Sequence, residues 1–395
     1  MIARVLSSNV NDASAGRCRT PGVAIVVPSL QGGGAERVSA RLAGSFGRLG
    51  WRSTLVTLDG PRSDCYPVPE GVSRIALHRA GSSARATGAV RANVERALAI
   101  RAALRSVDAD VALGMMATCS VLVAIATRGT RIAAVGAERI HPPCLPLGRA
   151  WETARRLAYP MLDAVVAQTE RSADWLRRHA GVRRVVVIPN AVQRPLPELA
   201  PSVPPEAWVR DHERVVLAVG RLDAQKGFDV LVRAFARVRG QRPGWRLVLV
   251  GDGPERAALQ ALAASLGVQD AVAMPGRVGN VGRWLGRADV YVLSSRFEGF
   301  PNTLVEAMDA GIACIATDCE TGPREIVRDG EDGLLVPVDD PRAMADALLA
   351  LTGDGRRRAE LGERARAVAE RFDEARIEAR WMDVLGALVP AGGAR

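Results

Sequence analysis

The chain has 395 residues, of which 48% are hydrophobic and 24% are charged, so we expect two or three globular domains. It lacks any apolar run of about 18 residues, so we expect no membrane-spanning helix. Its formal net charge of +10 is uneven, because residues 1–200 hold 27 arginines against 14 acidic residues (+13), whereas residues 201–395 hold 26 basic and 29 acidic residues (−3). The basic half predicts an anionic partner, and the absence of zinc-finger, RNP and basic-zipper patterns argues against nucleic acid.

The first half of the chain reads as a parallel α/β domain. Residues 1–20 lack the apolar segment of a secretory signal and are expected to be a disordered lead-in. Short apolar runs then alternate with helical stretches, which predicts a Rossmann-like acceptor domain over residues 21–195. Its predicted strands are Val23–Val27, Ser53–Thr57, Val111–Leu113, Ile132–Val135, Ala164–Ala167 and Val185–Ile188, and its predicted helices include Ala35–Leu49, Ala89–Arg105 and Trp151–Tyr159.

The proline-rich stretch 195–205 predicts a linker, which we place at residues 196–208. A second Rossmann-like domain is expected over residues 209–372, followed by a C-terminal helix at 373–395 that could pack on either domain. The predicted strands of the second domain are Val215–Val219, Arg246–Val250, Val272–Met274, Val290–Leu293, Ala313–Ala316 and Leu334–Val336. The helices should begin near Phe228, Pro254, Val281, Asn302, Pro323 and Pro341. Two such domains should bind ligands in a cleft between the carboxyl ends of their strands.

The loop after the first strand of the second domain carries two cations. It runs from Gly220 through Arg221 and Lys226 to a helix that begins near Gly227. Of the 53 basic residues, Lys226 is the single lysine, and in so arginine-rich a chain a retained lysine indicates a site that needs a compact point charge. A forked guanidinium, an ammonium and a helix N-terminus together suit a diphosphate. The alternative is a solvated surface loop.

A second loop places Glu298 before a helix and Glu306 on its second turn, with Asn302 or Thr303 expected to cap that helix. If the whole span were helical, the two carboxylates would lie about 12 Å apart. The carboxylates of glycosidases are separated by about 5 to 9.5 Å, so hydrolysis is disfavoured. The arrangement suits a phosphate at the helix N-terminus with sugar hydroxyl groups on either side. Each glutamate alone could equally be an ordinary helix residue.

Other motifs are weaker. Asp108-Ala109-Asp110 matches the D-x-D of metal-dependent transferases but precedes an apolar strand, so we expect a simple turn there. Gly251-Asp252-Gly253 follows a strand as in a dinucleotide fingerprint, but Arg256 stands at the third glycine position. The six cysteines form no C-x-x-C pair, which argues against zinc and fits a reducing cytoplasm. The arginines and apolar residues of the predicted helix 89–105 suit either a membrane surface or a solvated face over a core.

Several segments together resemble glycosyltransferase family 4, from about Val23 to Ala350. The glycine-rich stretch Ser29–Arg37 resembles the first-domain loop of that family. The segments of the second half that carry the resemblance are GRLDAQKGFDVLVRAF, VLVGDGPER, ADVYVLSSRFEGFPNTLVEAM, ATDCETGPREIV and DGEDGLLVP. EGFPNTLVEAM contains the E-x7-E motif of the family. The resemblance implies an α/β GT-B architecture, in which two Rossmann-like domains face each other across a cleft.

By this resemblance, Arg221 and Lys226 would hold the donor diphosphate, Glu306 would bind the ribose hydroxyls, and Glu298 would contact the transferred sugar. The other implied donor contacts are Gly33, Gly34, Gly276, Arg277, Val278, Gly299, Phe300, Pro301, Asn302, Thr303 and Leu304. The backbone N–H groups of Thr303 and Leu304 would face the distal phosphate. On the acceptor side, Gly32 would allow close approach of the backbone.

The contribution of the first domain is less sharply indicated. Family members commonly present a histidine or an acidic residue from a loop near the transferred sugar. Here that loop resembles an S-E-R-x-x-P variant with Ala137 in place of serine, which makes Glu138 a catalytic candidate and Arg139 an acceptor-binding one. His141 is a further catalytic candidate, with an ordinary loop histidine as the alternative.

The expected function is therefore that of a retaining glycosyltransferase that needs no metal and no cofactor. It would use a nucleotide diphosphate-sugar, with the stretch CETGPREIV favouring a UDP-hexose or a UDP-N-acetylhexosamine. The acceptor would be lipid-linked or a saccharide in surface polysaccharide or glycolipid synthesis. We expect a cytoplasmic protein that is peripheral on an anionic membrane. The alternatives are a nicotinamide-dependent oxidoreductase and a GT-B protein that isomerises or only binds a nucleotide sugar.

Overall fold

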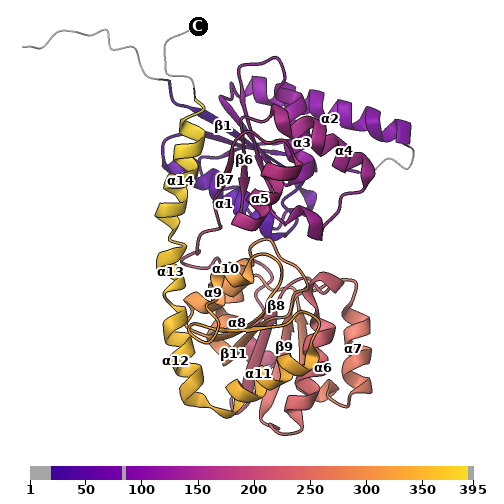
Figure 1. Ribbon diagram of the computed structural model, residues 1–395, viewed down its shortest axis with the longest axis vertical. Coiled ribbons are helices and arrows are strands. Elements are labelled where there is room, and N and C mark those ends of the chain that lie inside the picture. Colours follow the sequence, from indigo (N-terminus) through magenta and orange to yellow (C-terminus); the bar gives the residue numbers. More distant parts are fainter. Residues whose placement is uncertain (1–18, 82–85, 390–395) are drawn as a thin grey trace, which may run out of the picture.

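A computed structural model describes residues 19–81 and 86–389, which form two α/β domains placed end to end (Figure 1). Within these residues, each domain contains one parallel sheet. The first sheet has the order β3-β2-β1-β4-β5-β6-β7 and the second the order β10-β9-β8-β11-β12-β13. The expected fold class, two facing Rossmann-like domains, is confirmed.

The first domain contains seven strands within the described residues. They are β1 (Gly22–Val27), β2 (Arg52–Thr57), β3 (Ser73–Ala76), β4 (Val111–Met115), β5 (Ala133–Ala137), β6 (Ala164–Ala167) and β7 (Val185–Val187). Its helices are α1 (Gly34–Arg48), α2 (Ala86–Ser106), α3 (Ala117–Thr127), α4 (Arg149–Ala158) and α5 (Glu170–His179). The edge strand β3 was not predicted, because its residues are short of apolar side chains and none of them is buried.

The second domain follows the predicted strands closely. They are β8 (Arg214–Val219), β9 (Trp245–Val250), β10 (Val272–Gly276), β11 (Val290–Leu293), β12 (Ala313–Thr317) and β13 (Leu334–Val336). Its helices are α6 (Phe228–Arg239), α7 (Arg256–Ser265), α8 (Val281–Arg287), α9 (Asn302–Asp309), α10 (Pro323–Ile326), α11 (Pro341–Gly353), α12 (Gly355–Ala365) and α13 (Val368–Arg371).

Side-chain alternation along the strands builds a separate core on each face of a sheet. In β1, Val23, Ile25 and Val27 pack toward α1, whereas Ala24 and Val26 pack toward α2 and α3. The second sheet is covered by α6, α7 and α11 on one face and by α8 and α9 on the other. Both sheets are therefore buried on both faces, which explains the nearly continuous apolar strand sequences.

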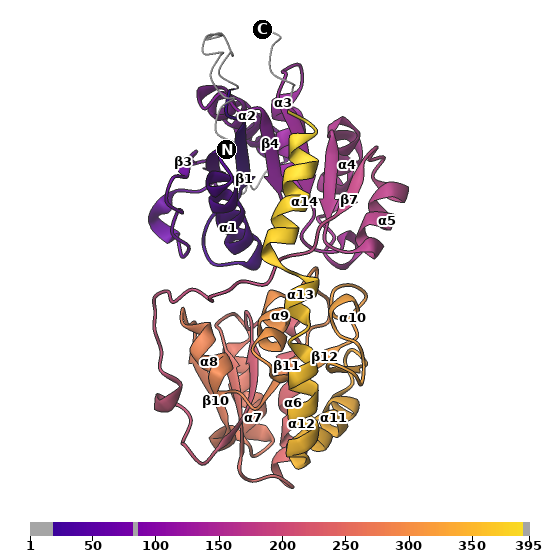
Figure 2. The ribbon, with the colours of Figure 1, turned by 90° about the vertical axis from the view of Figure 1, so that its left-hand side faces the viewer.

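The C-terminal helix α14 (Glu374–Gly386) returns to the first domain. After α12 and α13, the chain runs up the side of the molecule from the second domain to the first (Figure 2). Ile377, Trp381 and Leu385 of α14 are buried in the same cluster as β1 and α1. This helix therefore belongs to the core of the first domain, a point that the sequence left open.

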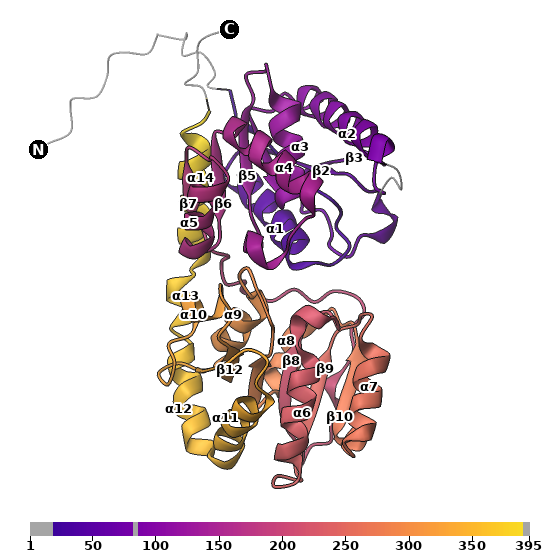
Figure 3. The same cartoon turned by 45° about the vertical axis from the view of Figure 1, so that its right-hand side comes forward.

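A segment between the two sheets lies against the second domain (Figure 3). The N–H of Leu199 donates to Gly279 O at 3.0 Å, and the N–H of Gly279 donates to Pro201 O at 2.7 Å. Asn280 Nδ2 also donates to Val203 O at 3.0 Å. The proline-rich connection is thus held at residues 199–203 to the loop that precedes α8.

Candidate active site between the two domains

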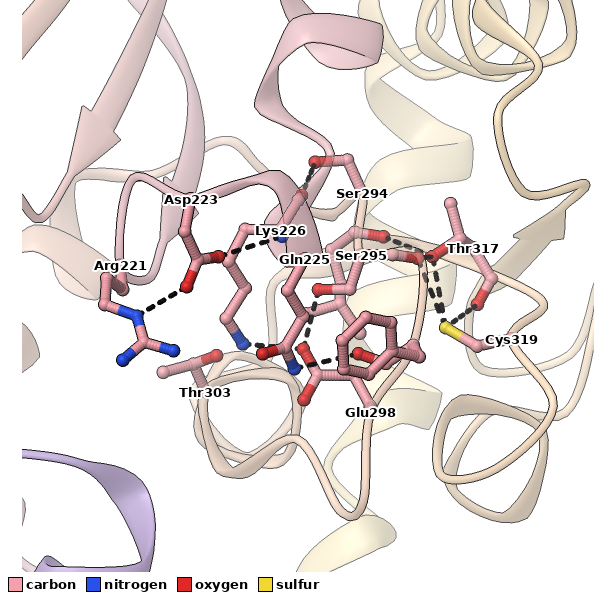
Figure 4. Close-up of polar contacts among 12 residues, drawn as sticks. Arg221, Asp223, Gln225, Lys226, Ser294, Ser295, Glu298, Thr303, Thr317 and Cys319 are labelled. Atoms are coloured by element: carbon pink, nitrogen blue, oxygen red, sulfur yellow. Dashed lines mark hydrogen bonds and ion pairs between the residues drawn. The ribbon is translucent and has the colours of Figure 1, made fainter. Parts of the chain in front are cut away.

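Two loops of the second domain meet because the strands before them are neighbours in the sheet. β8 is followed by the loop 220–227, and β11 by the loop 294–301. Gly227 adopts the left-handed conformation (φ +59°), and a Cβ there would overlap the carbonyl oxygen of Ser294. Ser294 Oγ donates to Lys226 O at 2.8 Å, and the N–H of Arg296 donates to Gln225 O at 2.7 Å. The two loops are therefore locked together (Figure 4).

Lys226 and Glu298 form a direct ion pair at this junction. Lys226 Nζ donates to Glu298 Oε1 at 2.6 Å, and Ser295 Oγ donates to the same oxygen at 2.6 Å. The side chains are 19% and 8% exposed, respectively. The structure thus brings together the expected diphosphate cation and the expected sugar-binding carboxylate, a contact that spacing along the chain did not predict.

Arg221 lies at the exposed edge of the same loop. Its side chain is 69% exposed, and Nε donates to Asp223 Oδ2 at 2.5 Å. Asp223, which the sequence analysis did not single out, also caps the short 3-10 turn Ala224–Lys226 by accepting from Lys226 N at 3.3 Å. Burial raises the pKa of Glu36 in the first domain, and the positive charge of Arg221 offsets part of that rise. Arg221 is therefore close enough to the first domain to interact electrostatically with Glu36.

Glu306 lies on α9 and is buried. Its Oε1 atom accepts a hydrogen bond from Arg37 of α1, so the contact joins the two domains. The other oxygen, Oε2, is buried and has no hydrogen-bond partner among the described residues. Arg37 was not predicted as a site residue, although it ends the glycine-rich segment Ser29–Arg37.

The glycine-rich loop itself faces the second domain. Gly33 is the N-cap residue of α1, and a Cβ at Gly34 would lie 3.6 Å from Asn302 Nδ2. A Cβ at Gly32 would crowd the guanidinium of Arg277, whose Nη1 donates to Gln31 O at 3.4 Å. The loop therefore packs against two of the predicted donor-binding segments.

The segment Gly276–Val278 lies at the end of β10. Gly276 has φ +87° and accepts a hydrogen bond from the N–H of Gly251 at 2.9 Å. The side chain of Val278 is buried in the core, so a ligand could contact this residue only through its backbone.

A second polar connection between the domains runs through α9. Asn190 Nδ2 donates to Asn302 Oδ1 at 2.6 Å, and Arg139 Nη2 donates to Asn190 Oδ1. Gln168 donates to the carbonyl oxygen of Arg139 at 2.7 Å, and a Cβ at Gly299 would overlap that same oxygen. Arg139 is buried and has no carboxylate partner among the described residues, and burial lowers its pKa to about 10.

The start of α9 differs from the prediction. Pro301 occupies the N-cap position and no side chain caps the helix, so a cap by Asn302 or Thr303 was wrong. Thr303 Oγ1 instead accepts from Tyr291 Oη at 2.7 Å. The N–H of Leu304 already donates to Pro301 O at 3.2 Å, which leaves it less free for a phosphate than predicted. Phe300 is buried in an edge-to-face contact with Phe372, so it could contact a donor only through its backbone.

The position of Glu138 argues against its predicted catalytic role. Its Oε1 atom accepts from Tyr159 Oη at 2.5 Å and lies 3.3 Å from Arg155 Nε. Val135 and Ala137 of β5 point toward α1, so alternation turns Glu138 to the opposite face, toward α4. Burial raises the pKa of Glu138. Glu138 is therefore part of the interior of the first domain and does not face the cleft.

His141 lies at the interface of the domains. Its Nδ1 is 3.1 Å from Ser172 Oγ, and its Nε2 is 3.8 Å from Glu320 Oε1 of the second domain. Burial lowers the pKa of His141, which favours the neutral imidazole at pH 7. Arg171 Nε also donates to Glu320 Oε1 at 2.9 Å. His141 thus remains a candidate beside the cleft.

The D-x-D pattern Asp108-Ala109-Asp110 is engaged in contacts within the first domain. Asp108-Ala109-Asp110 lies in the predicted turn between α2 and β4, and Asp110 Oδ2 accepts from the N–H of Gly22 at 2.7 Å. Among the described residues, no group of three or more His, Cys, Asp and Glu side chains is placed to hold a metal ion.

Comparisons with known proteins agree with this geometry. The family model described as Glycosyltransferase Family 4 matches residues 32–194, and the model described as Glycosyl transferases group 1 matches residues 205–368. An exopolysaccharide phosphotransferase of Streptomyces coelicolor is 33% identical over 73% of this chain and 29% of its own length. A 4-alpha-N-acetylgalactosaminyltransferase of Campylobacter jejuni is 28% identical over 56% of this chain and 59% of its own length. The chain thus spans less than two thirds of either relative.

Among solved structures, sucrose-phosphate synthase from Thermosynechococcus elongatus is similar, with a TM-score of 0.80 at 20% identity over 93% of this chain and 99% of that one. The two parallel sheets and this structural similarity together define the GT-B fold of glycosyltransferases. The chain belongs to glycosyltransferase family 4.

Proposed function

We propose that this glycosyltransferase transfers a hexosyl or N-acetylhexosaminyl group from a UDP-sugar to a lipid-linked or saccharide acceptor, with retention of anomeric configuration and without a metal ion. The observation that carries the proposal is the ion pair between half-buried Lys226 and buried Glu298, which lies where β8 and β11 end and α9 begins. In the donor, a diphosphate is joined directly to a sugar. The cation of Lys226 would bind the diphosphate, and the adjacent carboxylate of Glu298 would bind the sugar.

The proposed chemistry is electrostatic. When the bond between the anomeric carbon and the distal phosphate oxygen breaks, negative charge accumulates on the leaving nucleoside diphosphate. Lys226 and Arg221 would stabilise that charge, and the interdomain cleft would hold them in place before the reaction. Glu298 would accept a hydrogen bond from a hydroxyl group of the transferred sugar. The acceptor hydroxyl group would attack the anomeric carbon from the face that the diphosphate leaves, which retains the configuration, and would pass its proton to the departing phosphate oxygen.

A lipid-linked acceptor is supported by the relatives and by charge. The Campylobacter jejuni relative is named for an acceptor in which saccharide is attached to diphospho-undecaprenol. In this chain the domain opposite the donor loops is the basic one, with 27 arginines in residues 1–200. A diphosphate-linked acceptor and an anionic membrane would both be attracted to that domain.

Helix α2 provides a membrane-binding face for this proposal. Val90, Val94 and Leu98 are 67%, 52% and 60% exposed and recur every four residues, so they form one apolar stripe. Arg91 and Arg105 are exposed on the same helix. No helix in the described part of the chain is long and apolar enough to span a bilayer. An exposed apolar stripe flanked by arginines suits the surface of an anionic membrane.

The double substitution Val94→Glu, Leu98→Glu should reduce cosedimentation with vesicles of phosphatidylglycerol and phosphatidylcholine by about tenfold, because it removes apolar contact and adds repulsion. Binding of the unsubstituted protein should weaken as salt increases. Leu266→Glu, at a leucine that is 37% exposed on the second domain, is the matched control and should bind normally. If the double variant sediments with vesicles as strongly as the unsubstituted protein, α2 is not the helix that contacts the membrane.

The donor proposal is tested by thermal shift with UDP, GDP and ADP and their sugar conjugates. UDP and a UDP-sugar should raise Tm most, and a ligand at 100 times its Kd contributes about 2.7 kcal/mol to the free energy of unfolding. If GDP or ADP raises Tm more than UDP does, the donor base is guanine or adenine and not uracil. If no nucleotide raises Tm, the donor site itself is wrong.

A further inference from the structure

The carboxylate of Glu306 is only half satisfied. Oε1 accepts from Arg37, whereas Oε2 is buried and has no hydrogen-bond partner among the described residues. The Glu306 side chain is 4% exposed and that of Arg37 is 18% exposed. An unpaired buried acceptor is unfavourable, and a ligand hydroxyl group that donates to Oε2 would remove this penalty.

The partner of this carboxylate comes from the opposite domain. Arg37 is on α1 and Glu306 is on α9, 269 positions later. The two residues also line one cavity, together with Asn190 and Asn302. The contact that orients Glu306 therefore exists only while the two domains are together.

Arg41, one turn further along α1, has a different role. Its Nε donates to Glu374 at 2.9 Å, and its other nitrogens donate to the carbonyls of Ala191 and Val192 at 3.2 and 2.8 Å. Arg41 thus fastens α1 to α14 and to the connecting segment, with all its contacts satisfied by the chain. Arg37 instead pairs with the carboxylate of Glu306, whose Oε2 atom has no hydrogen-bond partner among the described residues.

We infer that Arg37 is a positioning residue for recognition of the donor ribose: it holds Oε1 of Glu306 so that the carboxylate is set to accept the ribose hydroxyl groups. The inference rests on the proposed donor function, in which Glu306 binds the ribose. Under this inference, the preference for a ribonucleotide depends on a side chain of the acceptor domain. The preference should therefore be complete only when the two domains are in contact.

The test compares the nucleoside diphosphate that binds tightest among UDP, GDP and ADP with its 2′-deoxy analogue by calorimetry. The unsubstituted protein should favour the ribonucleotide by about tenfold or more, since a hydrogen bond to a buried carboxylate is lost with the hydroxyl group. Arg37→Met should reduce this ratio to about threefold or less, mainly by weakening binding of the ribonucleotide. Arg37→Lys should restore part of the preference.

Two reference variants make the result interpretable. Glu306→Gln should also reduce the preference, and Arg41→Met, a matched arginine on the same helix, should keep it; Tm reports whether each variant is folded. If the unsubstituted protein binds both nucleotides equally or binds none, the ribose assignment of Glu306 fails. If it discriminates and folded Arg37→Met discriminates equally well, the ribose assignment stands and the inference about Arg37 is overturned.

Discussion

Replacement of Lys226 with alanine should lower kcat/KM by about 100-fold, equivalent to about 2.7 kcal/mol of transition-state stabilisation. The half-buried ammonium of Lys226 is paired with Glu298, and its removal leaves Glu298 with Ser295 as its side-chain partner. The leaving diphosphate should be less stabilised, and the side chain of Glu298 should be less firmly oriented. The measurement is the rate of sugar transfer at limiting donor concentration.

Two further variants define what Lys226 supplies. A Cβ at Gly220 would lie 3.2 Å from Cδ and Cε of Lys226, so the lysine stem packs closely along the loop. We expect Lys226→Arg to recover little activity, because a planar guanidinium is broader than an ammonium. Arg356→Ala removes one charge at an exposed helix position and should leave the rate unchanged. Normal kinetics in folded Lys226→Ala would remove the diphosphate assignment.

Substitution of Gly299 with alanine should also lower kcat/KM by about 100-fold, because displacements of about 1 Å at a reacting centre have effects of this size. The added Cβ would overlap the carbonyl oxygen of Arg139 in the first domain. The domains would have to separate, or the Glu298 loop would have to shift. The cores of both domains are untouched, so we expect Tm to change little.

The matched control is Gly244→Ala, since a Cβ at Gly244 meets no atom within 4 Å. Small-angle scattering should show whether Gly299→Ala enlarges the radius of gyration, as separation of the domains requires. A folded Gly299→Ala variant with unchanged kcat/KM would mean that the close contact between Gly299 and Arg139 has no part in catalysis.

The sequence predicts the fold well because hydrophobic patterns are local. Buried parallel strands and amphipathic helices alternate in both halves, and each strand of the second domain was located to within about two residues. The packing of α14 could not be predicted in this way. An amphipathic pattern shows that one face of a helix is buried, but Trp381 carries no information about which domain receives it.

Only part of the candidate site could be predicted from the sequence. Lys226 was indicated by its uniqueness, and the roles of Glu298 and Glu306 rested on the family pattern. Their partners were harder to foresee, because the pair between Arg37 and Glu306 depends on how two domains meet. The predicted catalytic role of Glu138 did not take account of side-chain alternation along β5, which directs this residue toward α4.

Acceptor-dependent release of nucleoside diphosphate is the most direct test of the proposed function. With a UDP-sugar as donor and a lipid-diphosphate-linked saccharide as acceptor, we predict that UDP release rises strongly when the acceptor is added. The same stimulation should be about 100-fold weaker in Lys226→Ala. A protein that isomerises or only binds the nucleotide sugar would release no additional UDP. Release that is unaffected by both the acceptor and the Lys226 substitution would contradict a transferase with its donor site between β8, β11 and α9.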